Sequence, residues 1–417
     1  MMKDVVIVSA CRTAIGSFGG SLRDLHVVDL ASVAMREAIR RSGVAPELID
    51  DVRFGNCFEP YNSLNLTRIA ALKAGVPNTS VAVTINRVCI SGMEATISGM
   101  AMIQAGLADI ILSGGAEHMS GIAYAVPGAR WGCRLQNSTL DDQLIEGLMC
   151  GSRILPAPAD SPLAGGMPYD LYKGKPYIMG HTAEFIAQMY GISREEMDEV
   201  ALRSHNNVER ATKEGDFAEE IVPVEIPQKK GKPPKIFDKD EHFRPGITLE
   251  DLRNLPPAFI PKTGKVTAGN ASGLNDAASA TVIMSMEKAK ELGLKPLAKI
   301  KAVGYGGCDP SVMGLSPVPA VRSLMKRSGL KLEDFELIEV NEAFAAQYLG
   351  CEKELKINRE ITNVNGSGIG LGHPVGATGN RIMVTLIHAM KKRKKTLGLA
   401  TLCGGGGVSI ATAIEML

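Results

Sequence analysis

The sequence predicts an α/β fold made of two similar halves, and two observations carry this prediction. Apolar strand-like runs alternate with helical stretches, as where the strand-like run 109–112 follows a helical stretch from about 92 to 105. Such alternation predicts a mostly parallel sheet with helices on both faces. In addition, the chain repeats itself internally, which indicates that the α/β unit is present twice.

The clearest repeat joins two segments near the ends of the chain. Residues 40–56 read RRSGVAPELIDDVRFGN, and residues 326–342 read KRSGLKLEDFELIEVNE. Both contain a basic helix end, a Ser-Gly stop, a short acidic turn, an apolar strand and then Asn. The serines of the two stops, Ser42 and Ser328, lie 286 residues apart.

A second pair of segments repeats at nearly the same distance. One strand ends in glycines at Gly115 and another at Gly405, which lie 290 residues apart. Two independent matches at nearly one offset indicate duplication. Each half is expected to open on a strand, at 5–9 and at 298–303. The helix 92–105 of the first half is apolar on every side, which predicts burial between two sheets.

The composition changes between the halves, in the segment 121–268. Here prolines are frequent, and Ser193 followed by Glu196 forms a capping box in an expected helix over 181–213. We expect an inserted, loop-rich domain that supplies coenzyme, substrate and oligomer contacts. The expected domains are a first half of 1–120 with 269–292, an insert of 121–268 and a second half of 293–417.

Composition excludes several classes of function. Among 417 residues, 46 basic side chains nearly balance 45 acidic ones, so no excess positive charge would hold nucleic acid. No apolar run reaches the roughly 18 residues of a membrane helix, so no membrane is expected, and the opening MMKDVVIVSACRT lacks a signal-peptide layout. We therefore expect a cytoplasmic protein. The eight cysteines form no C-x-x-C pair, which argues against a disulfide framework or a metal site.

Cys89 is the first candidate for chemistry. It stands in NRVCISGMEA, after a strand-like run at 81–85 and directly before the buried helix. The free N–H groups at a helix amino terminus would stabilise a thiolate and form part of an oxyanion hole. The alternative reading is an ordinary buried thiol.

The second half holds the candidate partners of Cys89. Asn341 and Glu342 follow a strand, His373 stands in a glycine-dense loop, and Cys403 ends a strand before four glycines. Two thiols and an imidazole can supply a nucleophile, its base and a second acid or base. Each also has a structural reading, as a loop histidine, a core thiol or a residue at a turn.

Several motifs together resemble the thiolases, which include acetyl-CoA acetyltransferases and 3-ketoacyl-CoA thiolases. They occur in the family's order and span the chain from Val5 to its carboxyl end; they are VIVSACRTAIGSFGG, NRVCISGMEA, SGGAEHMS, TAGNASGLNDAA, NEAFA, GLGHPVGATG and LCGGGG. The resemblance implies two similar βαβαβαββ halves in a layered α/β/α/β/α arrangement, with a loop domain inserted in the first half.

The resemblance also implies the roles of five residues. Cys89 would carry the acyl group as a thioester, and His373 would activate it. Cys403 would move the α-proton of the second acetyl unit. Asn341 would position a water that binds one thioester oxygen together with the ring of His373. The backbone N–H groups of Cys89 and Gly405 would form the other oxyanion hole.

The same resemblance implies contacts with coenzyme A. Coenzyme A and acyl-CoA esters are expected as substrates, no permanently bound cofactor is expected, and the chain is expected to form a homodimer or homotetramer. The family's YHMG-type motif departs here, because Ile178 replaces its histidine and His181 follows three residues later; the stretch 148–177 is also longer than in short-chain members. The implied coenzyme A contacts are Arg244, Leu255, Ala268, Ser272, Met313, Ala343 and Phe344.

The expected reaction condenses two acetyl-CoA molecules or cleaves a 3-ketoacyl-CoA with free coenzyme A. Two other classes stay open. GSGIGLG resembles a dinucleotide-binding loop, which would suit a nicotinamide-dependent oxidoreductase, although no first-strand fingerprint accompanies it. A non-catalytic acyl-CoA or lipid carrier on the same fold is opposed by the joint presence of Cys89, His373 and Cys403.

Overall fold

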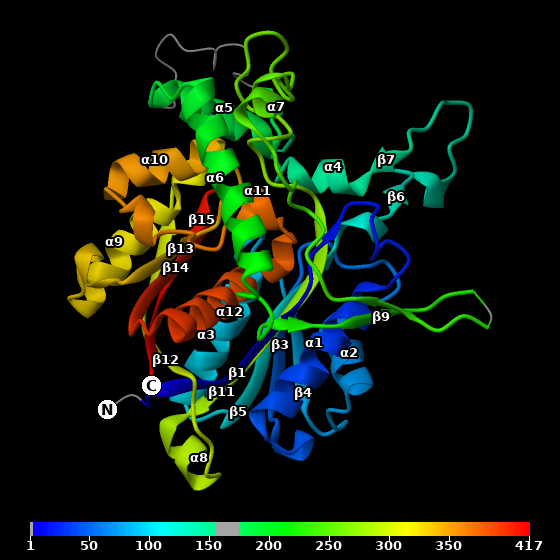
Figure 1. Cartoon of the computed structure of the whole chain (residues 1–417). Coiled ribbons are helices and arrows are strands. Elements are labelled where there is room, and N and C mark those ends of the chain that lie inside the picture. Colours follow the sequence, from blue (N-terminus) through cyan, green and yellow to red (C-terminus); the bar gives the residue numbers. More distant parts are fainter. Residues whose placement is uncertain (1–2, 155–174, 230) are drawn as a thin grey trace.

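The computed structural model describes residues 3–154, 175–229 and 231–417 and has an α/β architecture (Figure 1). In this part of the chain, eleven strands form one mixed sheet, so the expectation of a mostly parallel sheet is wrong: its long central strands pair antiparallel. They are β1 (Val5–Thr13), β2 (Gly16–Ser17), β3 (Asp51–Gly55), β4 (Val81–Ile85), β5 (Ile110–His118), β8 (Ile221–Val222), β11 (Asn275–Ser285), β12 (Ala298–Gly307), β13 (Leu337–Val340), β14 (Leu397–Gly404) and β15 (Val408–Met416).

The strand order confirms the predicted duplication. The first half runs β1-β11-β5-β3-β4 and the second runs β12-β15-β14-β13. In each half two antiparallel pairings come first, followed by two parallel pairings in the first half and one in the second. An isolated parallel bridge between Ile338 and Thr362 stands where the second half would have a fifth strand. The halves join where β1 pairs with β12, at Val6 and Lys299.

Helices form three layers around these strands. The central helices α3 and α12 pack against each other, and Figure 1 shows them side by side in the middle of the molecule. On the outer faces, α1 and α2 cover the first half and α9 packs on β12 and β15. The helices of the two halves are α1 (Val27–Ser42), α2 (Leu66–Ala74), α3 (Ser91–Gln104), α8 (Met286–Glu291), α9 (Pro317–Ser328), α10 (Ala345–Leu355), α11 (Gly368–Leu371) and α12 (Val375–Arg393).

The repeated sequence signals explain the outer helices. The Ser-Gly stops predicted after α1 and α9 are observed, because Gly43 and Gly329 end these helices in the left-handed region, at φ 69° and 76°. A side chain other than glycine is strained there. The same signal therefore closes the same helix in both halves.

Glycines let the two central helices approach closely at their amino-terminal ends. A Cβ atom at Gly92 of α3 would lie 2.8 Å from the carbonyl oxygen of Gly376 and 3.0 Å from the backbone nitrogen of Asn380, both in α12. Backbone cannot move away as a flexible side chain can. The residues that precede the two helices, Cys89 and His373, are thereby brought to one end of the central layer.

The segment 121–268 differs from expectation in one element. The expected single helix over 181–213 is wrong, because Gly191 turns the chain at φ 60° and Ser193 starts a new helix. The predicted capping box of Ser193 and Glu196 is present. The elements here are β6 (Tyr124–Ala125), β7 (Asp141–Asp142), α4 (Gln143–Leu148), α5 (Met179–Met189), α6 (Arg194–Lys213), β9 (Val224–Ile226), β10 (Lys235–Phe237) and α7 (Leu249–Arg253).

This segment is tied to the main sheet by hydrogen bonds and a buried ion cluster. Its strand β8 pairs with β1, where Arg12 lies opposite Ile221. The buried guanidinium of Arg12 donates to Glu220 at 2.7 Å and to both carboxylate oxygens of Asp240 at 2.7 and 2.9 Å. Such bidentate pairs fix orientation. Among the described residues, no helix is long and apolar enough to cross a membrane.

Candidate active site

Cys89 lies in a tight turn between β4 and α3. The side chain of Asn86 accepts a hydrogen bond from the backbone N–H of Val88 at 3.0 Å, and Ser91 accepts one from Arg87 at 2.8 Å. Val88 adopts φ 50°, a left-handed conformation that is rare for a β-branched residue. The turn thus holds strained backbone directly beside the thiol, and such strain gathers at functional sites.

The thiol of Cys89 is neutral at rest. Burial raises its pKa to about 12, and neighbouring Cys150 adds to this rise. Hydrogen bonds from the backbone N–H groups of Gly405 and of Cys89 itself act in the opposite direction and are outweighed. The backbone N–H groups therefore favour the thiolate, as expected, but desolvation outweighs them. A nucleophilic Cys89 needs a base.

His373 directly precedes α12 in the second half, as Cys89 precedes α3 in the first. Its backbone N–H donates to Asn275 at 2.8 Å. Its ring atom Nδ1 lies 2.7 Å from Oγ1 of Thr378 and 3.4 Å from the side-chain nitrogen of Asn341. Atom Nε2 is buried and has no hydrogen-bond partner among the described residues. Burial, with a contribution from Arg381, lowers the imidazole pKa to about 3.

Cys403 lies near the end of β14 and is 1% exposed. Burial raises the pKa of its thiol well above the ordinary value, and the second-largest cause is Cys89. Both thiols and the imidazole of His373 are uncharged at neutral pH, so the site holds no buried charge on these groups before a proton moves.

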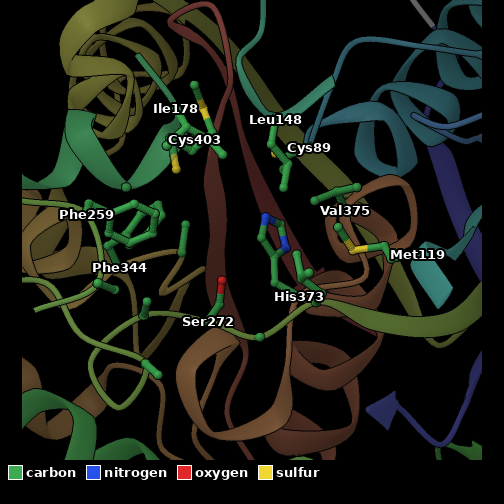
Figure 2. Close-up of a pocket in the computed structure, with 18 of the residues that line it drawn as sticks. Cys89, Met119, Leu148, Ile178, Phe259, Ser272, Phe344, His373, Val375 and Cys403 are labelled. Carbon is green, nitrogen blue, oxygen red and sulfur yellow. The ribbon is translucent and has the colours of Figure 1, made fainter. Parts of the chain in front are cut away.

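The three groups share one apolar cavity of about 380 Å³. Figure 2 shows Cys89, His373 and Cys403 around the same space, with Phe259 and Phe344 across from Val375 and Met119. Five of the expected coenzyme A contacts also line it, namely Ala268, Ser272, Met313, Ala343 and Phe344.

The other residues expected at the site do not line the first cavity. Asn341 is fully buried beside the ring of His373. Gly405 lines an adjoining cavity of about 350 Å³, whose wall also includes Cys89 and Cys150. Arg244 is exposed and Leu255 is half-buried, and neither lines the first cavity.

Several lining residues were missed by sequence reasoning. Within the described chain these include apolar side chains from distant segments, and only their apolar character signalled them. Thr378 was also missed, although its place in the first turn after His373 was a usable signal. The missed lining residues include Met119, Ile145, Leu148, Phe259, Leu274 and Val375.

Ile178, which replaces the histidine of the YHMG-type motif, forms part of the wall of the first cavity. Its neighbours Met179 and Gly180 line the same cavity. The ring of His181 is held away from this position, because Nδ1 accepts from the backbone N–H of Ile178 at 3.2 Å and Nε2 lies 3.3 Å from the carbonyl of Phe259. Of the longer stretch 148–177, residues 155–174 lie outside the described residues.

A duplicated α/β fold with two thiols and an imidazole in one apolar cavity is typical of enzymes that transfer acyl groups through a cysteine. Comparison with known families agrees with this class. The family model "Thiolase, N-terminal domain" matches residues 5–157 and 163–287, and "Thiolase, C-terminal domain" matches residues 294–416. The chain belongs to the thiolase family.

Individual relatives match along their whole length. The acetyl-CoA acetyltransferase of Cupriavidus necator is 46% identical over 415 residues, which cover 99% of this chain and 100% of that protein. The crystal structure of the Bacillus anthracis acetyl-CoA acetyltransferase superposes with a TM-score of 0.92 at 46% identity, covering 100% of this chain and 99% of that one. Human mitochondrial 3-ketoacyl-CoA thiolase in complex with CoA gives 0.89 at 38% identity, with coverage of 100% and 98%.

Proposed function

We propose that this thiolase transfers acyl groups between coenzyme A esters through a thioester on Cys89. The observation that carries the proposal is the meeting of Cys89, His373 and Cys403 around one cavity. In the first step, Nε2 of His373 takes the proton of Cys89 while sulfur attacks the thioester carbonyl. The coenzyme A thiolate then leaves and takes up that proton, which leaves acyl-Cys89 and a neutral imidazole.

The second step makes or breaks a carbon–carbon bond. In condensation, Cys403 first gives its thiol proton to Nε2 of His373, and the resulting thiolate removes the α-proton of a second acetyl-CoA. The carbanion attacks acyl-Cys89, and the Cys89 thiolate leaves and takes the proton from His373. The charge that builds on oxygen needs donors in both steps. The backbone N–H groups of Cys89 and Gly405 are proposed as one set, and the ring of His373 with a water held by Asn341 as the other. Thiolysis is the same path in reverse.

Coenzyme A would enter through the cavity in which Ala268, Ser272, Met313, Ala343 and Phe344 lie. Its apolar wall suits the alkyl part of a pantetheine arm. The human relative of known structure was solved with CoA, which supports the assignment of the ligand. Leu255 and exposed Arg244 are proposed to contact the coenzyme beyond the cavity.

Intact-protein mass spectrometry tests the proposed covalent step. Brief exposure to acetyl-CoA should add one acetyl group, and peptide mapping should place it on Cys89. Cys57→Ser is the matched control, since Cys57 lines the adjoining cavity with Cys89 and should still permit labelling. An acetyl group that persists on another cysteine in Cys89→Ser would overturn the assignment. Binding without any acylation would instead favour a non-catalytic carrier.

We further propose that the acyl substrate extends beyond four carbons. Ile178 makes one wall of the first cavity apolar, and a second cavity of about 350 Å³ opens beyond Cys89, where Phe58, Val88 and Leu148 lie. Burial of each added methylene is favourable by about 0.8 kcal/mol. The second cavity supplies space for such methylenes while the reacting carbonyl stays on Cys89.

The measurement is kcat/KM for thiolysis of four-, six- and eight-carbon 3-ketoacyl-CoA esters. We expect the longer esters to be used at least as well as the four-carbon one, and Ile178→His to shift the preference toward four carbons. Cys150→Phe, which fills the second cavity, should reduce the eight-carbon value by about tenfold relative to the four-carbon value. A strict four-carbon preference that both substitutions leave unchanged would contradict the proposal.

We also infer that the chain assembles with itself. The edge strand β4 has Val81 63% exposed, and the nearby loop leaves Tyr61 and Leu64 at 84% and 90%. Exposed apolar side chains beside an unpaired strand edge are typical of an association surface. Light scattering of the purified protein should give a dimer or tetramer mass, and a monomer at micromolar concentration would contradict this inference.

A further inference from the structure

The hydroxyl of Thr378 contacts the imidazole ring of His373 at Nδ1, whereas the other ring nitrogen, Nε2, has no hydrogen-bond partner among the described residues. Thr378 lies in the first turn of α12, and its Oγ1 is 2.7 Å from Nδ1 of His373 and 2.9 Å from the carbonyl oxygen of Pro374. All three residues are buried in the described structure. A hydroxyl has one proton to donate, so one of these two contacts must be an accepted hydrogen bond.

The surroundings of the ring decide which contact is accepted. A neutral imidazole carries one N–H. A proton on Nε2 has no protein acceptor among the described residues, whereas a proton on Nδ1 has Oγ1 of Thr378 at 2.7 Å. With the proton on Nδ1, the ring donates to Thr378, and Thr378 donates to Pro374. Every polar hydrogen of the three residues then has an acceptor.

We propose that Thr378 is a positioning residue, which holds His373 as the tautomer with its proton on Nδ1 and its lone pair on Nε2. This inference rests on the proposed function, in which Nε2 takes the proton of Cys89. The same arrangement serves the reverse transfer, because Nδ1 keeps its proton throughout while Nε2 gains one and returns it to the leaving thiolate. No other group exchanges a proton in this step.

The pKa shifts agree with this arrangement. Burial of Cys89 and of His373 favours the neutral form of each, so transfer creates an ion pair only while substrate is bound. The side-chain nitrogen of Asn341, which can only donate, lies 3.4 Å from Nδ1 and favours an unprotonated Nδ1, but at that distance it acts more weakly than Thr378 Oγ1 at 2.7 Å.

Substitution of the hydroxyl separates positioning from packing. Thr378→Val keeps the shape and removes the acceptor, whereas Thr378→Ser keeps the acceptor. The matched control is Thr385→Val in the same helix, where a buried threonine bonds to Glu220 at 3.2 Å and lies about two turns beyond Thr378. The measured quantity is the rate of acetylation of Cys89 by acetyl-CoA, followed by mass spectrometry, with thermal melting recorded for every variant.

We expect Thr378→Val to lower the acetylation rate at least tenfold while KM for acetyl-CoA changes less than threefold. Thr378→Ser and Thr385→Val should stay within threefold of the unmodified enzyme. The variant His373→Asn separates a failure of the proposed base, His373, from a failure of the proposed positioning residue, Thr378. If it retains acetylation, the proposed base is wrong; if it loses acetylation while Thr378→Val remains within threefold, only the positioning role is overturned.

A direct readout of the tautomer does not depend on activity or on the stability of the valine variant. Nitrogen-15 NMR of histidine-labelled protein should show, for the ring signal that disappears in His373→Asn, a protonated Nδ1 and an unprotonated Nε2 at pH 7. Thr378→Ser should keep this pattern. A signal with the proton on Nε2 in the unmodified protein would overturn the proposal.

Discussion

The two halves of the molecule share one topology and place different chemistry at equivalent positions. Directly before the central helix, the first half has Cys89 and the second has His373. In the strands that lead to the paired glycines, the first half has Ser113 of β5 and the second has Cys403 of β14. Ser113 bonds to Thr281 inside the core, 2.9 Å away, whereas Cys403 lines the cavity.

This difference shows how a duplicated fold produces an asymmetric site. The repeat provides two helix amino termini and two strand ends, and close packing of α3 against α12 brings them together. In the proposed reaction, one half supplies the nucleophile and the other supplies both proton carriers. A site made this way depends on the contact between the halves as much as on any single residue.

The largest effect is expected where the strand positions differ. Cys403→Ala should reduce thiolysis of acetoacetyl-CoA by roughly a hundredfold or more, because the α-carbon loses its acid and base. Ser113→Ala, the equivalent change in the first half, should lower kcat/KM less than threefold. Steady-state kinetics with both variants makes the comparison, and similar losses in the two would contradict a division of roles between the halves.

A smaller effect is expected where the central helices touch. Gly92→Ala places Cβ against backbone of α12, which should reduce the free energy of unfolding by about 3 kcal/mol and slow acetylation of Cys89. The matched control is Gly99→Ala in the same helix, whose nearest neighbours are side-chain atoms of Ile111 and Ile283 at 3.1 and 3.2 Å.

Because side chains can shift, Gly99→Ala should change the free energy of unfolding by less than about 1 kcal/mol. Urea denaturation of both variants provides the values. Equal stability of the two variants would show that the backbone contact between the halves does not hold the helices in place.

The smallest effect is expected from pH. Alkylation of Cys89 by iodoacetamide should vary less than about threefold between pH 5.5 and 8.5, because the pKa of His373 is lowered to about 3 and that of Cys89 is raised to about 12. Acid therefore does not protonate His373 in this range, and Cys89 stays almost entirely in the thiol form. The reaction then runs through the neutral pair, in which His373 takes the proton as sulfur attacks, and the amount of this pair does not change with pH. The extent of alkylation is measured by peptide mapping.

An imidazole at its ordinary pKa of about 6.5 would lose about nine-tenths of its basic form by pH 5.5. An unassisted thiol would gain about tenfold in rate per pH unit, since only its thiolate reacts. Either pH profile would contradict the account in which Cys89 of the first half and His373 of the second half are both uncharged between pH 5.5 and 8.5.

The sequence alone was sufficient for much of this comparison. The repeated Ser-Gly stops and the strand ends at Gly115 and Gly405 predicted the duplication, because local signals of this kind act within a few residues. The break at Gly191 was missed because the helical pattern continues on both sides of it. The degree to which burial raises the pKa of Cys89 could not be predicted from the sequence, since desolvation depends on neighbours such as Cys150 that come from elsewhere in the chain.

The central claim is that the first half carries the acyl group while the second half supplies two separable proton carriers. The most direct test measures the first step alone, as acetyl groups added to Cys89 by acetyl-CoA within seconds, in His373→Asn and Cys403→Ala. We predict that His373→Asn loses this step by roughly a hundredfold or more, whereas Cys403→Ala keeps it and loses carbon–carbon bond formation. Equal loss of acetylation in both variants, or normal condensation by Cys403→Ala, would contradict the claim.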